Sequence, residues 1–137
     1  MINEKDVVRM KVPFPSISDG MALSSHMYIC HKHLGMQYEY IKCQTLKPYM
    51  ITNCPMTHYH DEVPDISRNP FTRTTRIDCD KLFLTATVNY DDKLKTINRP
   101  DICQDLFNTL QTKLLQDGYS NININESLLK QINSLIY

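Results

Sequence analysis

Two runs of strand-forming residues, joined by a short connection, place the strongest constraint on how this chain folds. The ranges Met27–Cys30 and Tyr38–Cys43 are rich in tyrosine and isoleucine, which favour extended structure. The connection includes Leu34–Met36, with a glycine at its centre, and such a connection is typical of a β-hairpin. The sequence therefore predicts an antiparallel pair of strands in its first third.

Further strands are predicted before and after this hairpin. Val7–Val12 mixes apolar and charged residues in an approximate strand pattern, and Pro13 and Pro15 end it because proline cannot donate to a ladder. The pattern of a strand returns over Arg76–Val88. Between the hairpin and that segment, residues 47–74 contain four prolines and no clear period. This predicts a long irregular insertion, and a loop of such length usually has a functional role.

The last third of the chain has the pattern of helices. Apolar residues recur at steps of four from Ile102 to Leu114, which predicts a helix with one side facing the core. Pro100 suits its first turn, and Gly118 suits the position after its end. A shorter helix is predicted over Glu126–Ile136. Strands followed by helices indicate the α+β class, as a single domain over residues 1–137 with a small curled sheet.

Composition narrows the setting and the class of partner. Five cysteines at irregular spacing favour reduced thiols in a cytoplasmic protein over a disulfide framework. No apolar run approaches the length needed to span a bilayer, so no membrane partner is expected. The formal net charge is zero, from 15 basic and 15 acidic residues. A nucleic-acid binder of this composition would have to gather its positive charge on one face.

Several enzyme classes are disfavoured by motifs that the chain lacks. With only three glycines, it has no glycine-rich phosphate loop and no dinucleotide fingerprint. It also has no nucleophile elbow and no CxxC pair. Nucleotide-driven and redox chemistry are therefore not expected, and no cofactor is predicted.

Arginine and aspartate gather in the middle of the chain. On a strand, Arg76, Asp78 and Asp80 would share one face because side chains alternate with period two. An arginine beside carboxylates could orient a scissile phosphate while a carboxylate transfers a proton. The alternative is a surface ladder of ion pairs without catalytic role. Arg68 and Arg73 precede this segment and could add contacts to a nucleic-acid backbone.

A threonine near the end of the hairpin is a second candidate. Thr45 is flanked by Lys42 and Lys47, so its hydroxyl could meet a phosphate oxygen that the lysines attract. The alternative is a threonine that caps a turn at the end of a strand.

Cysteine and histidine cluster twice, in Cys30–His33 and in Cys54–His60. Zinc accepts such ligands, but neither spacing is an established zinc motif, so no metal is predicted. A zinc-stabilised binding domain stays an alternative. The histidines could instead be polar surface residues, or act as acid or base because histidine titrates near neutrality.

Taken in order, these segments resemble the MazF/PemK family of toxin-type endoribonucleases, from about Asp6 to about Leu115. The resemblance rests on the opening strand with its proline loop (Val7–Pro15) and on the Arg76–Phe83 segment, in which an arginine and aspartates precede an apolar hook. Thr45 resembles the family's threonine or serine at the end of a central strand. The predicted helix from Pro100 corresponds to the family's closing helix.

The resemblance implies a fold, an activity and partners. The fold would be a small SH3-like β-barrel with C-terminal helices, usually a homodimer. The activity would be sequence-dependent cleavage of single-stranded RNA without metal, with the ribose 2′-hydroxyl as nucleophile. The cognate partner would be an antitoxin protein that inserts a peptide into the RNA groove. The residues expected at the catalytic centre are His26, Arg76, Asp78, Asp80 and Thr45, and those expected to contact RNA are Arg68, Arg73, Lys42 and Lys47.

The chain departs from the family at the start of the second strand. Many active members have an arginine–proline pair there, whereas this chain has Leu23–Met27 without arginine. His26 is the ionisable residue of that stretch and would have to replace the arginine. An alternative function is therefore a non-catalytic barrel of this type that binds protein or nucleic acid.

Overall fold

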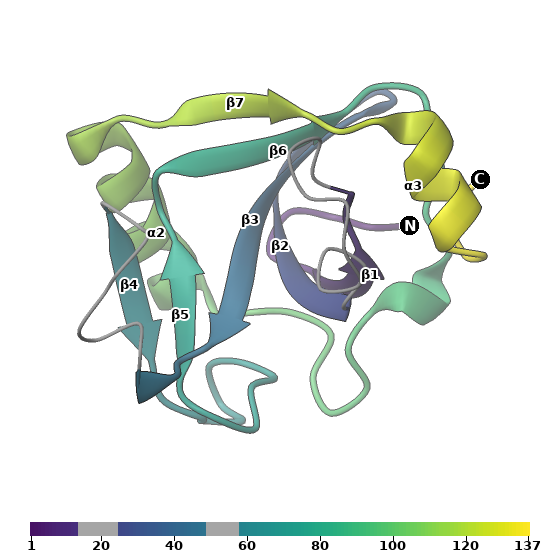
Figure 1. Ribbon diagram of the computed structural model, residues 1–137. Helices are drawn as coiled ribbons and strands as arrows, with labels where there is room; N and C mark the ends of the chain where they lie inside the picture. Colours follow the sequence, from purple (N-terminus) through teal and green to yellow (C-terminus); the bar gives the residue numbers. More distant parts are fainter. Residues whose placement is uncertain (14–24, 49–57) are drawn as a thin grey trace.

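The structure is a computed structural model that describes residues 1–13, 25–48 and 58–137. Over these residues it is a small α+β protein with a seven-stranded, largely antiparallel sheet (Figure 1). The elements in chain order are β1 (Val7–Lys11), β2 (Ser25–Leu34), β3 (Gln37–Thr45), β4 (Tyr59–Glu62), β5 (Thr75–Asp78), β6 (Lys81–Thr85), the 3-10 helix η2 (Asp92–Leu94), α2 (Gln104–Asp117), β7 (Ser120–Asn123) and α3 (Glu126–Ile132).

The predicted hairpin is confirmed as β2 and β3. Their ladder runs from Met27 opposite Cys43 to Leu34 opposite Gln37, with a bulge after Cys30. Gly35 lies in the turn at φ 62°, a conformation that glycine adopts without steric cost. The predicted opening strand is also confirmed, because β1 pairs antiparallel with β2 along its whole length.

The predicted strand from residue 76 to residue 88 is two strands that meet at a corner. Both pair with β3, but with different parts of it: Ile77 of β5 lies opposite Cys43, and Phe83 of β6 lies opposite Tyr40. Between them the chain turns at Cys79 and Asp80, and Figure 1 shows β5 and β6 running in different directions. The expectation that Asp80 shares one strand face with Arg76 and Asp78 is therefore wrong.

Two strands were not predicted from the sequence. β4 lies inside the segment expected to be irregular and pairs with β5, and β7 pairs in parallel with β6. Their sequences, YHDE and SNIN, contain almost no apolar residues. They consequently lack the period-two hydrophobic signal of a strand, and their conformation depends on the neighbouring strand. Residues 49–57 of the same insertion lie outside the described part of the chain.

The sheet is open. Its main path is β1-β2-β3-β5-β4; β6 pairs with β3 along the same edge as β5, and β7 pairs with β6. Among the described residues no ladder joins β1 to β4 or to β7. The coarse α+β prediction is thus confirmed, whereas the sheet does not close into the SH3-like barrel that the family resemblance implied.

Both faces of the sheet are buried, which divides the apolar residues into two cores. α2 covers one face, and the segment that contains η2, α3 and the C-terminus covers the other (Figure 1). Residues of β2 and β3 alternate between the cores, so that Ile29 and Ile41 belong to the first, and Tyr28 and Tyr40 to the second. The hairpin is therefore the central layer of the molecule.

Both predicted helices are present, but Pro100 precedes α2 and does not lie in its first turn as predicted. α2 begins at Gln104, after Cys103, whose sulfur accepts from the Leu106 N–H. Its C-cap is Gly118 at φ 79°, as the sequence indicated. α3 ends at Ile132, earlier than the predicted Ile136. Neither described helix has the length and apolarity needed to cross a membrane.

The packing of α2 makes a prediction about stability. Leu110 is completely buried, whereas Leu115 on the same helix is 79% exposed. We expect Leu110→Ala to lower the free energy of unfolding by about 2–5 kcal/mol, because the deletion leaves a cavity. Leu115→Ala should change it by no more than about 0.5 kcal/mol. Urea denaturation of both variants measures this, and equal effects would contradict the assignment of the buried face.

Candidate functional site

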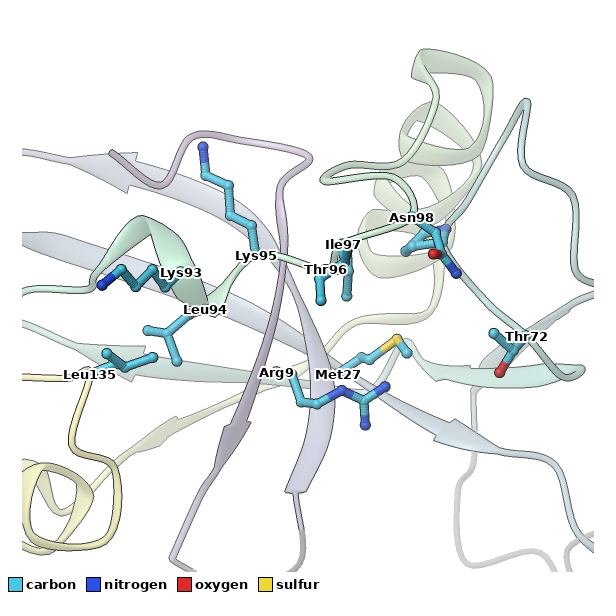
Figure 2. Close-up of a pocket in the computed structure, with 11 residues that line it drawn as sticks. Arg9, Met27, Thr72, Lys93, Leu94, Lys95, Thr96, Ile97, Asn98 and Leu135 are labelled. Atoms are coloured by element: carbon cyan, nitrogen blue, oxygen red, sulfur yellow. The ribbon is translucent and has the colours of Figure 1, made fainter.

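Two adjoining pockets form a groove beside the start of β2. The narrow pocket has a volume of about 240 Å³ and the wide pocket about 390 Å³, and both are lined by Arg9, Met27 and Thr72. The narrow pocket is completed by Ser25, His26, Cys43, Gln44, Thr45, Phe71, Arg73 and Thr75. The wide pocket, drawn in Figure 2, is completed by Pro70, Leu135 and residues 93–98.

The groove has a one-sided charge. Among the described residues that line it, none is aspartate or glutamate, whereas Arg9, Arg73, Lys93 and Lys95 are basic. Lys95 is ion-paired with Asp6, with 3.2 Å between its Nζ and the carboxylate. In a chain whose formal net charge is zero, this gathering creates the local positive field that an anionic ligand needs.

Arg9 occupies the junction of the two pockets because of its position in β1. It lies opposite Met27 of β2, and its strand neighbours Val8 and Met10 point into the core on the other face. Figure 2 shows Arg9 and Met27 side by side in the wide pocket. No motif marked Arg9 in the sequence. Its place in an alternating strand was the one available signal, since it is the exposed residue between two buried ones.

One wall of the narrow pocket is held by a buried asparagine. Asn69 is fully buried; its Nδ2 donates to Glu62 Oε2 at 2.9 Å and to the Val63 carbonyl at 3.0 Å. Its Oδ1 accepts from the N–H groups of Phe71 at 3.0 Å and Asp65 at 3.3 Å. These bonds fix the course of the chain that leads to Phe71, Thr72 and Arg73.

Arg68, which the sequence suggested as an RNA contact, does not line the groove. It binds Glu62, the carboxylate that also accepts from Asn69. Its Nε donates to Glu62 Oε2 at 2.9 Å. Burial of the Glu62 carboxyl opposes ionisation, but bonds from Arg68, His60 and Asn69 outweigh it and lower its pKa. The guanidinium thus neutralises a buried carboxylate beside the groove.

Three of the predicted site residues meet in the narrow pocket: His26, Thr45 and Arg73. Burial lowers the pKa of His26 to about 4, and the charges of Lys42, Lys47 and Arg9 lower it in the same direction. At neutral pH the imidazole is therefore uncharged. His26 lies within β2, so it is held by a strand and not by a loop.

Arg76 is not part of the groove. It is buried, and its Nε and Nη2 donate to the two carboxylate oxygens of Asp61 at 2.8 and 2.9 Å. Its guanidinium carbon also lies 3.7 Å from the centre of the Tyr59 ring. Because Asp61 and Arg76 are direct partners in the β4–β5 ladder, the arginine clamps these strands together. Unlike His26, Arg76 therefore does not line either pocket.

Asp78 and Asp80 form a separate polar cluster at the β5–β6 corner. The Asp80 N–H donates to Asp78 Oδ1 at 2.9 Å, and Lys81 Nζ lies 2.9 Å from Asp80 and 3.6 Å from Asp78. Burial raises the pKa of Asp78 to about 7; interaction with the Asp80 side chain adds to the rise, whereas the bond from the Asp80 N–H opposes it. Burial also lowers the pKa of the nearby Lys42, and the negative charge of Asp78 partly opposes this lowering. None of these residues lines the groove.

The cysteine and histidine groups do not form a described metal site. His31 Nδ1 lies 3.4 Å from Glu39, and His33 Nε2 lies 2.8 Å from the Gly35 carbonyl. Burial raises the pKa of the Cys30 thiol to about 12. Across the described ranges, no three His, Cys, Asp or Glu side chains are arranged to hold a metal ion. Residues 54–57 of the second group lie outside those ranges.

Comparisons of this chain with models of protein families, with curated proteins and with solved structures find no match. The geometry and charge of the groove are therefore the features that indicate a function.

The wall of the narrow pocket generates a prediction. Asn69→Ala removes four hydrogen bonds and leaves buried polar groups without their partner. We expect the free energy of unfolding to fall by about 2–4 kcal/mol, measured by urea denaturation. Asn121→Ala, at an exposed position of β7, is the matched control and should stay within about 0.5 kcal/mol of the parent protein. Similar values for the two variants would show that Asn69 does not hold the wall.

The corner cluster generates a pH-dependent prediction. Because the pKa of Asp78 is raised from its ordinary 3.8 to about 7, its contribution to stability is present below pH 3.8 and is lost as the pH rises through 7. Asp78→Asn keeps an oxygen for the Asp80 N–H but cannot ionise. We therefore expect this variant to be more stable than the parent at pH 8, with a much smaller difference near pH 4.

Urea denaturation at the two pH values measures this difference. Glu4→Gln, which neutralises an exposed carboxylate, is the control and should have little effect at either pH. A loss of stability in Asp78→Asn at pH 8 would mean that the charged carboxylate is stabilised by Lys81.

Proposed function

We propose that this protein binds single-stranded RNA along the groove, with Arg9 and Arg73 contacting phosphate oxygens. The observation that carries the proposal is the absence of carboxylates from the described lining, in a chain with as many acidic as basic residues. Within the described part of the chain, neither Arg9 nor Arg73 is engaged in an ion pair, so both are available to a ligand. Arginine is well suited to phosphate because its planar fork can donate two parallel bonds.

The shape of the groove favours a single strand over a duplex. Recognition of double-stranded RNA uses an extended surface that follows the helix across successive grooves. Here the basic residues surround two small adjoining hollows, which also include apolar side chains such as Met27, Phe71 and Leu135. A single strand can place its phosphates and its unstacked bases in such hollows separately.

Cleavage of the bound RNA is a second candidate function, and the observation that favours it is that His26 lines the narrow pocket together with Thr45 and Arg73. On this proposal His26 takes the proton from a ribose 2′-hydroxyl, whose oxygen attacks the neighbouring phosphorus. Arg9, Arg73 and the Thr45 hydroxyl stabilise the charge that develops on phosphate. The 5′-oxygen leaves and receives a proton from the imidazolium, and a cyclic phosphate remains.

This second candidate is the metal-independent, toxin-type endoribonuclease that the MazF/PemK resemblance implied. His26 would then take the place of the family's second-strand arginine. The open sheet, with β3 shared between β5 and β6, would be a variant of the family's SH3-like barrel. A homodimer and an antitoxin protein would be the expected partners. Arg76, Asp78 and Asp80 would support the fold on this proposal, since none of them lines the narrow pocket.

Binding is tested with a fluorescent single-stranded RNA and its salt dependence. We expect Arg9→Ala and Arg73→Ala each to weaken binding by about tenfold at moderate salt, because each removes a charged hydrogen bond. Each should also reduce the slope of log K against log salt by about 0.7, the value for one phosphate contact on a single strand. Lys32→Ala, an exposed basic residue of β2 outside the groove, is the charge-matched control. An equal effect of Lys32→Ala would show that binding is diffuse and does not use the groove.

Cleavage is tested on the same RNA in the presence of a metal chelator. If the second candidate holds, the protein cuts the RNA, Glu4→Gln also cuts it, and His26→Ala binds but does not cut. An RNA with a single 2′-deoxyribose at the cut position should resist. Binding without cleavage by the parent protein would exclude the endoribonuclease and leave the RNA-binding proposal intact.

A further inference from the structure

We infer that the wide pocket receives an adenine base of the bound strand, and that Asn98 determines this specificity. The inference rests on the proposed RNA binding. Arg9 lines both pockets, so a phosphate bound to it in the narrow pocket lies next to the group that occupies the wide pocket. In a single strand, the neighbour of a phosphate is a sugar with its base.

The wide pocket has an apolar side that suits the face of a base. Leu94 is almost completely buried, and Leu135 and Met27 are packed against the two cores. Ile97 lies at the rim and is 98% exposed, so a ligand in the pocket would cover an apolar side chain that now contacts water. A flat, weakly polar ring gains from such contacts, whereas a phosphate or a sugar would not.

The opposite side of the pocket carries polar groups. Figure 2 shows Asn98 and Thr72 on one side of Arg9, across from Leu94 and Leu135. It also shows the amino groups of Lys93 and Lys95 directed away from the centre of the pocket. Of the Asn98 and Thr72 side chains, Asn98 is the one that offers a donor and an acceptor on separate atoms, so it can bond to two positions of a base held against the apolar side.

The segment that carries Asn98 is fixed at both sides of this residue. The Thr96 N–H donates to the Val7 carbonyl at 3.0 Å, which ties the segment to β1. Arg99 donates from Nε to Asp101 Oδ1 at 2.9 Å and from Nη1 to the Ile66 carbonyl at 3.1 Å. Asn98 itself is exposed, and no hydrogen bond to another described residue engages its amide. A fixed backbone with an available amide is what specific recognition requires.

The chemistry of the amide favours adenine. Asparagine pairs with adenine through two bonds: its oxygen accepts from the N6 amino group, and its nitrogen donates to N7. On this edge guanine presents two acceptors, so an amide cannot satisfy both with a donor–acceptor pair. The pyrimidines lack N7. Asn98 is therefore a specificity-determining residue that touches the base, and Arg9 provides the contact to phosphate that every sequence shares.

The test compares short RNAs that differ in one base. A nine-nucleotide oligouridine carries adenine, guanine, cytosine or 7-deazaadenine at its centre, the last of these being adenine without its N7 acceptor. We expect the parent protein to bind the adenine RNA roughly tenfold more tightly than the others, the effect commonly produced by one bidentate contact. Asn98→Ala should bind all five RNAs, including plain oligouridine, with the weaker affinity. Asn121→Ala, an exposed asparagine outside the groove, should keep the preference.

The outcomes separate this inference from the proposed function. Equal affinity of the parent for all the RNAs, or a preference for adenine that survives in Asn98→Ala, would overturn the role of Asn98 while RNA binding stands. No binding of any RNA by the parent would overturn the proposed function itself. Because Asn98 is exposed, thermal melts of the variant and the parent are expected to coincide, which excludes misfolding as the cause of a lost preference.

Discussion

The structure depends on the β2–β3 hairpin, and above all on the way β3 is shared. One edge of β3 pairs with β2, and the other pairs with β5 near its end and with β6 near its start. Because its side chains alternate between two buried cores, β3 joins the layer under α2 to the layer under the C-terminal segment. Every other strand takes its position, directly or through one neighbour, from this pair.

The same arrangement explains how a chain without net charge can present a positive groove. Most carboxylates near the sheet are used to neutralise basic side chains elsewhere, so they do not compensate the groove. The described pairs of this kind are Asp61 with Arg76, Glu62 with Arg68, and Asp78 and Asp80 with Lys81. Asp6 compensates one of the groove's own basic residues, Lys95. Arg9 in β1 and Arg73 before β5 remain in the groove, where no described carboxylate compensates their charge.

The sequence predicted the helices and strands that short local patterns encode, and it also predicted part of the site. The hairpin, β1 and α2 carry a clear hydrophobic period, a turn glycine or a helix-ending glycine, and each is confirmed. Thr45 was a candidate from its place at a strand end, Arg73 from the mid-chain arginines and His26 from the family resemblance, and the three line one pocket. Arg76 lies in a more suggestive motif, but it is buried against Asp61. The sequence did not indicate this pairing, because Asp61 belongs to β4, whose residues have no strand pattern.

By itself, then, the sequence determined the α+β class, the order of the main elements and a set of polar residues from which a site could be drawn. Hydrophobic periodicity and turn residues act over a few positions, which is why they could be read directly. Only the tertiary structure decided which charges are paired with each other and which face a ligand. That choice depends on contacts between distant segments, such as Arg9 beside Thr72 and Asn98, and no local pattern encodes them.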